Sequence, residues 1–417
     1  MARPTSGGEP RPAVYLHVGA AKSGTTYLQN VLWHNRERLR GNGLLYPGVD
    51  SASHVRAAFD LRETFFGGAA DPSVRGAWPA LVEEARAWHG DVILSQELFA
   101  PATAEEVARA LADLGFLDVH VVFTARDLAR QIPAHWQEDV KNRFTTSFPD
   151  FVAALRHRNW QGIDSARLFW GLQDPVAVLE RWGASLPPDR VHVVTLPRPG
   201  APRDLLWRRF CAAVGLVPDG YDLAVPYANP SLGLAETEFL RLLNGALDDG
   251  LGWPAYNDAV KHYLAQDVLT ARPDPVRIGL PAGDLLWATE RAIETAEGLR
   301  AAGYHVVGDL YELVPVEGVA GAESTEPPPA DLADVAVDAV AALLLRVRAR
   351  EGRAEGTPPA RDQIDWLRGE AAELADRTGR LADGALPLVH RAARNAAERY
   401  PAVRRVRGAY RRIQDRR

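Results

Sequence analysis

The stretch from Val14 to Gln29 constrains the fold more than any other part of this chain. It opens with an apolar run, Val14 to Val18, of the kind that forms a buried parallel strand. A short loop that carries Gly19 and Gly24 follows, and the residues after it favour a helix that we expect to continue to about Leu39. The first N–H groups of a helix lack internal partners and lie at the positive end of its dipole. We therefore expect an anion to bind where the strand, the loop and the helix meet.

The spacing inside the loop distinguishes two kinds of phosphate-binding loop. Gly19 and Gly24 match the outer glycines of G-x-x-x-x-G-K-[ST], but Thr25 stands where an ATPase keeps its lysine. Lys22 lies inside the loop instead, which argues against a standard ATP and Mg²⁺ site. Only three of the 48 basic residues (lysine and arginine) are lysines, so a lysine in this loop is a specific signal and not a frequent residue of this chain. The alternative is a simple glycine turn in which the lysine is incidental.

Further apolar runs alternate with helical patterns along the chain. The runs at Asp91–Phe99, Val119–Thr124 and Val191–Thr195 predict strands, and helical patterns separate them. This alternation predicts an α/β fold in which helices flank a doubly wound parallel sheet. Polar residues, Glu97 and Arg126 among them, stand at the carboxyl ends of two predicted strands, where ligands bind in open sheets of this class.

A resemblance supports the special character of the loop. The segment Ala21-Lys22-Ser23-Gly24-Thr25-Thr26 resembles the 5′-phosphosulfate loop of P-loop sulfotransferases that use 3′-phosphoadenosine 5′-phosphosulfate (PAPS), in which P-K-S-G-T-T is usual. Ala21 replaces the proline, which loosens the loop but removes no ligand. The resemblance covers residues 13–316 and is greatest to the bacterial carbohydrate and small-molecule type.

The resemblance implies a role for each residue of the loop. Lys22 would contact the bridging and sulfuryl oxygens of PAPS and stabilise the leaving group. The amides of Ser23 and Gly24, with the amides and hydroxyls of Thr25 and Thr26, would hold the 5′-phosphate. Sulfuryl transfer needs alignment and charge stabilisation, and the transferred group carries less charge than a phosphoryl group. We therefore expect no metal ion.

Glu97 is the candidate general base. Members of the family place a His or a Glu after the strand that follows the first long helical segment, and Ser95-Gln96-Glu97 stands at that position. A carboxylate there could accept the proton of the acceptor hydroxyl. The alternative is a helix-capping or surface carboxylate.

Arg126 is the candidate ligand of the donor's 3′-phosphate, because the segment Val121 to Asp127 resembles the family's strand that ends in arginine. A guanidinium can hold a phosphate with two parallel hydrogen bonds. The alternative for Arg126 is a structural salt bridge. The family's serine eight residues later is Ala134 here, so one contact is missing, and a hydrogen bond to a charged group contributes about 1.5–3 kcal/mol. Arg130, Gln131 and Lys141 are the residues that could compensate.

Composition limits the class of protein. The net charge of -6 gives no case for nucleic-acid binding, and no stretch approaches the roughly 18 uncharged apolar residues of a membrane-spanning helix. The lone cysteine, Cys211, allows no disulfide within the chain, which favours a cytoplasmic location.

The domain organisation follows from shifts in composition. We expect a disordered tail at 1–12, a catalytic domain at 13–316, a linker rich in proline and glycine at 317–330 and a helical extension at 331–417. The last part of the extension, 391–417, is rich in arginine and has a modest apolar face. It could lie on an anionic membrane and bring a lipid-linked acceptor to the site, or it could be a solvated or packed arm. Equal binding to liposomes with and without residues 387–417 would exclude the membrane role.

The sequence thus predicts a PAPS-dependent sulfotransferase that acts on a hydroxyl of a carbohydrate, a glycolipid or another small natural product. Two alternatives stay open: a nucleotide-dependent kinase of the same fold group, and a non-catalytic module that binds a partner. The sequence does not determine the acceptor or the oligomeric state.

Overall fold

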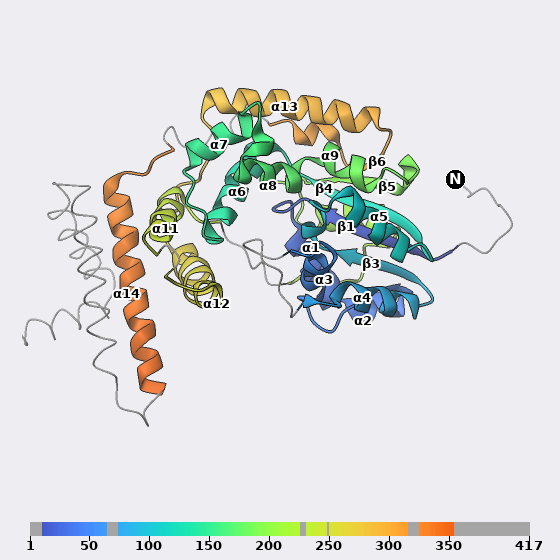
Figure 1. Cartoon of the computed structure of the whole chain (residues 1–417), viewed down its shortest axis with the longest axis horizontal. Coiled ribbons are helices and arrows are strands. Elements are labelled where there is room, and N and C mark those ends of the chain that lie inside the picture. Colours follow the sequence, from blue (N-terminus) through green and yellow to red (C-terminus); the bar gives the residue numbers. More distant parts are fainter. Residues whose placement is uncertain (1–10, 65–73, 226–230, 248–249, 316–324, 354–417) are drawn as a thin grey trace, which may run out of the picture. The chain divides into compact units, whose positions relative to one another are not determined.

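The computed structural model describes residues 11–64, 74–225, 231–247, 250–315 and 325–353, which belong to two compact units (Figure 1). Unit 1 draws on Met1–His135, Phe151–Ala228 and Ala282–Ala320, and unit 2 on Trp136–Asp150, Asn229–Pro281 and Gly321–Arg417. The predicted division into a catalytic domain and a helical extension stays a prediction.

Unit 1 is built on a six-stranded sheet with the order β2-β3-β1-β4-β5-β6, in which every pair is parallel. The strands are β1 (Ala13–Gly19), β2 (Leu44–Leu45), β3 (Asp91–Ser95), β4 (Asp118–Ala125), β5 (Val191–Thr195) and β6 (His305–Val307). The chain runs from β1 to one side of the sheet and returns across it from β3 to β4, so β1 lies at the point where the winding reverses. The predicted doubly wound parallel sheet is confirmed.

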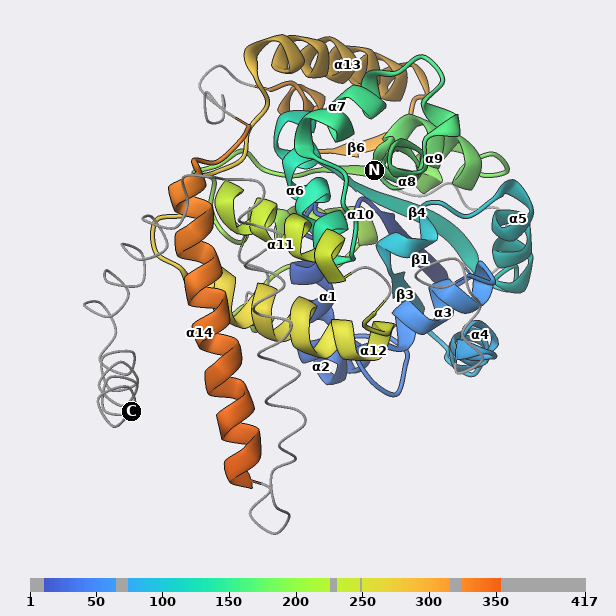
Figure 2. The same cartoon turned by 60° about the vertical axis from the view of Figure 1, so that its left-hand side comes forward.

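Helices cover both faces of this sheet because alternate side chains of β1 point to opposite faces. Val14, Leu16 and Val18 pack into one hydrophobic cluster, and Tyr15 packs into the other. The first cluster takes residues from α3 (Ser53–Leu61), α4 (Ala77–Arg86), α5 (Ala104–Asp113), α9 (Pro175–Trp182) and α13 (Ala282–Ala301). The second takes residues from α1 (Thr25–His34), α2 (Arg36–Gly41) and α10 (Leu205–Val214), and Figure 2 shows the layers from a second side.

The remaining described helices belong to one or the other unit. In and around unit 1 they are the turn η2 (Glu97–Phe99), α6 (Leu128–Lys141), α7 (Phe148–Arg156), η3 (Trp160–Gly162), α8 (Asp164–Gln173), η4 (Pro188–Arg190) and η7 (Leu310–Leu313). In unit 2 they are α11 (Leu234–Leu247), α12 (Trp253–Tyr256), η5 (Asn257–Val268), η6 (Leu269–Ala271) and α14 (Pro329–Arg353).

Unit 2 is helical, and buried polar side chains join its segments. Asn244 of α11 donates to the Val140 carbonyl at 2.7 Å and accepts from the Tyr256 hydroxyl at 2.7 Å. Arg272 forms an ion pair with Glu236 at 2.9 Å. The helix α14 overlaps the start of the extension predicted at 331–417, whereas the rest of that extension and its basic arm lie outside the described residues.

Two predicted elements end earlier than expected. The first helix stops at His34 because the Asn35 side chain donates to the carbonyls of Val31 and Asp222, each at 2.8 Å, and so competes with the helical backbone. The strand predicted at Asp91–Phe99 ends at Ser95, because Gln96 accepts a hydrogen bond from the Leu98 amide and starts a helical turn.

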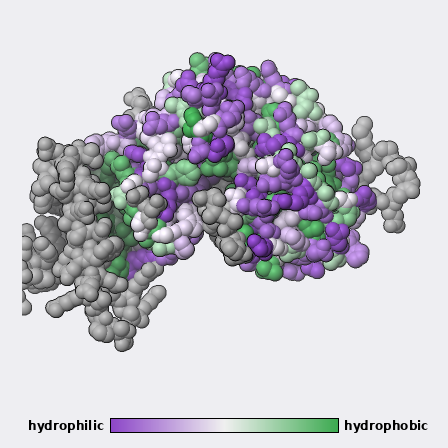
Figure 3. Space-filling view, viewed as in Figure 1, coloured by the Kyte–Doolittle hydropathy of each residue, from purple (hydrophilic) through white to green (hydrophobic). Residues whose placement is uncertain are grey.

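None of the described helices combines the length and the apolar content that are needed to cross a bilayer. In the view of Figure 3, polar residues cover most of the described surface of unit 1, and apolar residues form small separate areas.

Candidate functional site

The loop of residues 20–24 joins β1 to α1 in the middle of the sheet. Lys22 has φ 63° and Gly24 has φ 84°, so two of its residues adopt the left-handed conformation. Gly24 is also the N-cap of α1, and its carbonyl accepts the Leu28 amide at 3.1 Å. A Cβ at Gly24 would come within 2.4 Å of Leu206 Cδ2. Glycine is therefore required there both by the backbone angle and by the lack of space.

The inner side of the loop is fastened to β4. The Ala20 amide donates to the Thr124 carbonyl at 2.8 Å, and the Thr124 hydroxyl donates to the Gly19 carbonyl at 2.8 Å. Ser23 is fully buried, its hydroxyl lies 2.5 Å from the Thr124 hydroxyl, and its amide donates to the Ala20 carbonyl at 3.3 Å. The Ser23 side chain thus braces the loop from within.

Two side-chain donors hold the carbonyls on the other side of the loop. Arg126, which follows β4, donates from Nη1 to the Lys22 carbonyl at 2.8 Å. Gln131 on α6 donates from Nε2 to the Ala21 carbonyl. The structure therefore brings Arg126 to the loop that carries Lys22, as the spacing of the predicted strands leads one to expect.

Glu97 lies on the other side of β1, at the start of η2 after β3. Its carboxylate is half-buried and accepts a hydrogen bond of 2.9 Å from the Gln29 amide on α1. Gln29 also donates to the Ser95 carbonyl at 3.4 Å. Burial raises the pKa of Tyr46, and the negative charge of Glu97 raises it further.

A buried histidine connects the three central strands below the loop. His17 of β1 lies 2.8 Å from the Ser95 hydroxyl on β3 and 3.3 Å from the Thr124 hydroxyl on β4. Burial lowers the pKa of His17 to about 4, so its ring is neutral near pH 7. His17 is therefore a neutral core residue that supports the strands below the loop.

The three residues that could compensate for Ala134 have different partners. Arg130 forms an ion pair with the buried Asp127. Lys141, in unit 2, lies 3.8 Å from Glu138. Gln131 contacts the loop of residues 20–24 itself. The sequence signal for Gln131 is that it is a polar residue on the buried face of a helix, where a side chain needs a hydrogen-bond partner.

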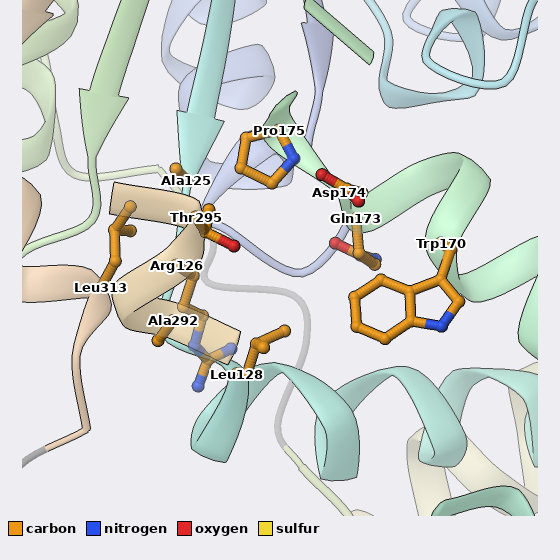
Figure 4. A pocket seen from close by; sticks show the side chains of 10 residues that line it. All are labelled: Ala125, Arg126, Leu128, Trp170, Gln173, Asp174, Pro175, Ala292, Thr295 and Leu313. Carbon is orange, nitrogen blue, oxygen red and sulfur yellow. The ribbon is translucent and has the colours of Figure 1, made fainter. Parts of the chain in front are cut away.

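A small recess opens beside Arg126 on the side of α8, α9 and α13 (Figure 4). Figure 4 shows Arg126 near Ala292 and Thr295, with Trp170 and Gln173 opposite. Ala125, Leu128, Asp174, Pro175 and Leu313 complete the lining. The guanidinium thus borders the recess as well as the loop.

No metal site is assigned. Within residues 11–64, 74–225, 231–247, 250–315 and 325–353, no three His, Cys, Asp or Glu side chains are grouped so that they could hold a metal ion.

Comparison with known proteins adds little to this geometry. No protein-family model and no curated protein sequence matches the chain. Among solved structures, the chain is similar to a sulfotransferase from Alicyclobacillus acidocaldarius, with 18% identity and a TM-score of 0.32 over 52% of this chain and 86% of that chain. An identity and a TM-score this low carry no argument about function, which the residues of the site must supply.

Proposed function

We propose that this chain is a PAPS-dependent sulfotransferase that transfers a sulfuryl group to a hydroxyl of a carbohydrate, a glycolipid or a small natural product. One observation carries the proposal. The loop that holds Lys22 follows the central strand β1, and the two neighbouring strands are followed by Glu97 on one side and Arg126 on the other. A cation within the loop, an arginine and a carboxylate are the groups that such a transfer requires.

The residues of the loop fit a donor that carries phosphate and sulfate groups. The N-terminus of α1 would offer the amides of Gly24, Thr25 and Thr26 and the two threonine hydroxyls to the 5′-phosphate, while Ser23 braces the loop from within. Lys22 and Arg126 add two positive charges, and Arg126 can turn from the Lys22 carbonyl to a 3′-phosphate, which is a stronger acceptor because it is charged. Gly24 keeps the entrance to the helix free of a side chain.

The chemistry is assigned to two side chains. PAPS would supply a sulfuryl group on a good leaving group. As the acceptor oxygen bonds to sulfur and the bond from sulfur to the bridging oxygen breaks, the Lys22 ammonium stabilises the charge that develops on that oxygen. The Glu97 carboxylate takes the proton of the acceptor hydroxyl, and the Gln29 amide holds this carboxylate in one orientation.

We further propose a cytoplasmic site of action. The support is the single cysteine, Cys211, which is free and buried, so that the chain forms no disulfide of its own, as is usual in a reducing compartment.

A labelled-donor assay tests this function. We expect purified protein to transfer ³⁵S from labelled PAPS to members of a panel of hydroxyl-bearing carbohydrates and glycolipids. Glu97→Gln should lower the rate by a factor of about 100 or more, the usual contribution of a general base, without changing the affinity for 3′-phosphoadenosine 5′-phosphate.

Glu37→Gln is the matched control, because Glu37 is a highly exposed carboxylate on α2. A Glu97→Gln rate like that of the control would rule out Glu97 as the base. Transfer of ³²P from γ-labelled ATP, in place of ³⁵S, would make the chain a kinase.

A further inference from the structure

Three buried side chains form a chain of hydrogen bonds that ends on the phosphate loop. Gln131 of α6 donates from Nε2 to the Ala21 carbonyl and also to Gln173 Oε1, at 2.5 Å. Gln173, at the end of α8, in turn donates from Nε2 to His135 Nδ1 at 3.0 Å. The three side chains are 2%, 4% and 3% exposed, in the order Gln131, Gln173, His135. We call this set the amide relay.

The relay has one consistent arrangement. The Gln131 amide group uses its two N–H bonds for two oxygen acceptors, and the Gln173 oxygen accepts while its nitrogen donates. Turning either amide over would place two donors or two acceptors against each other. The relay therefore fixes the position of Gln131 Nε2 against the loop.

Holding the Ala21 carbonyl fixes the direction of the next amide. A peptide group is planar and trans, so the Lys22 N–H points away from the Ala21 oxygen. Arg126 fixes the following peptide group through the Lys22 carbonyl. Lys22 itself adopts φ 63°, which is unfavourable for a residue with a side chain and needs support from its surroundings.

Packing alone does not account for Gln131. Within the described part of the chain, its Oε1 is buried and accepts no hydrogen bond, which costs stability that an apolar side chain of similar size would avoid. The donor half of the same amide is what reaches the loop. The loop also has alanine at position 21, where a proline would have restricted the backbone by itself.

We propose that Gln131, supported by Gln173 and His135, is a positioning residue that holds the phosphate loop in its anion-binding conformation. The part of this proposal that concerns the donor nucleotide rests on the proposed function. The part that concerns the loop conformation does not.

Hydrogen exchange tests the conformational part without a ligand. In Gln131→Leu we expect the amides of Lys22 and Ser23 to exchange about tenfold faster than in the wild type, as for the loss of one hydrogen bond. The matched control is Gln137→Leu, because Gln137 is a buried glutamine on the same helix that donates to the Leu232 carbonyl at 3.1 Å. The control should leave loop exchange within about twofold of the wild type, even where its overall stability falls.

Calorimetric titration with 3′-phosphoadenosine 5′-phosphate tests the part that concerns the donor. Gln131→Leu should weaken binding about tenfold, and Gln137→Leu should leave it within about twofold. If the wild type does not bind this probe but exchange of the loop amides still responds to Gln131→Leu, the sulfotransferase function is refuted. The positioning role of Gln131 then stands. Loop exchange that is the same in Gln131→Leu and in the wild type would refute the positioning role whatever the ligand.

Two further variants keep the proposal testable if Gln131→Leu does not fold. Gln173→Leu removes the side chain that holds the Gln131 amide. The loop amides should then exchange faster than in the wild type, as they do in Gln131→Leu. Gln131→Glu can donate to the Ala21 carbonyl only when its carboxyl is protonated, so protection of the loop, corrected for intrinsic exchange, should increase as the pH is lowered. A purely structural role of Gln131 predicts no such recovery of loop protection at low pH. Loop protection in Gln131→Glu that does not change with pH would contradict the proposal.

Discussion

At the scale of single residues, the site depends on left-handed backbone at Lys22 and Gly24. The spacing of the loop predicted both residues as functional, because a glycine before a helix and a lysine between two glycines form a local pattern. The contacts that hold the loop were not predicted. Thr124 and Gln131 reach the loop from segments that are distant in sequence, and no local pattern encodes such contacts.

Gly24→Ala should lower the free energy of unfolding by about 1–2 kcal/mol through its φ angle of 84°, and further through the overlap with Leu206. Gly76→Ala is the matched control, because Gly76 caps α4 with φ 86° and has open space around it. Urea unfolding should show a larger loss for Gly24→Ala than for Gly76→Ala. Equal losses would mean that the space near Leu206 does not restrict the loop.

At the scale of elements, apolar runs predicted β1, β3, β4 and β5 because a buried parallel strand needs apolar residues on both faces. The strand β6 (His305–Val307) was not predicted, since it is short and two of its residues are only half-buried. The end of α1 was predicted too late, because the hydrogen bonds of the Asn35 side chain with the backbone of the distant Asp222 help to decide it.

The buried histidines of the central elements should make stability depend on pH. Burial lowers the pKa of His17 and of His54 to about 4, whereas both titrate near 6.5 when unfolded. The unfolded chain thus binds more protons between these values, so this stability is fully present above pH 6.5 and is lost as the pH falls towards 4. The loss should be on the order of 3 kcal/mol for each histidine.

Urea unfolding between pH 7 and pH 4 checks this dependence. His17→Gln should flatten the curve in that window, and the exposed His34→Gln should not. A wild-type stability that stays constant down to pH 4 would show that the two buried rings do not titrate as their burial requires.

At the scale of the whole molecule, the predicted doubly wound sheet is confirmed, and it places the ends of β3, β1 and β4 side by side. This topology explains why three motifs that are far apart in sequence gather around one loop. The role of residues 354–417, including the basic arm, lies outside the described part of the chain.

The most direct test of the central claim is thermal unfolding with 3′-phosphoadenosine 5′-phosphate and, separately, with ATP with and without Mg²⁺. At 100 times its dissociation constant, the bisphosphate should stabilise the wild type by about 2.7 kcal/mol. The effect should weaken in Lys22→Ala and in Arg126→Ala. Stabilisation by Mg·ATP alone would contradict the sulfotransferase function and favour a kinase, and no stabilisation by either nucleotide would favour a non-catalytic binding module.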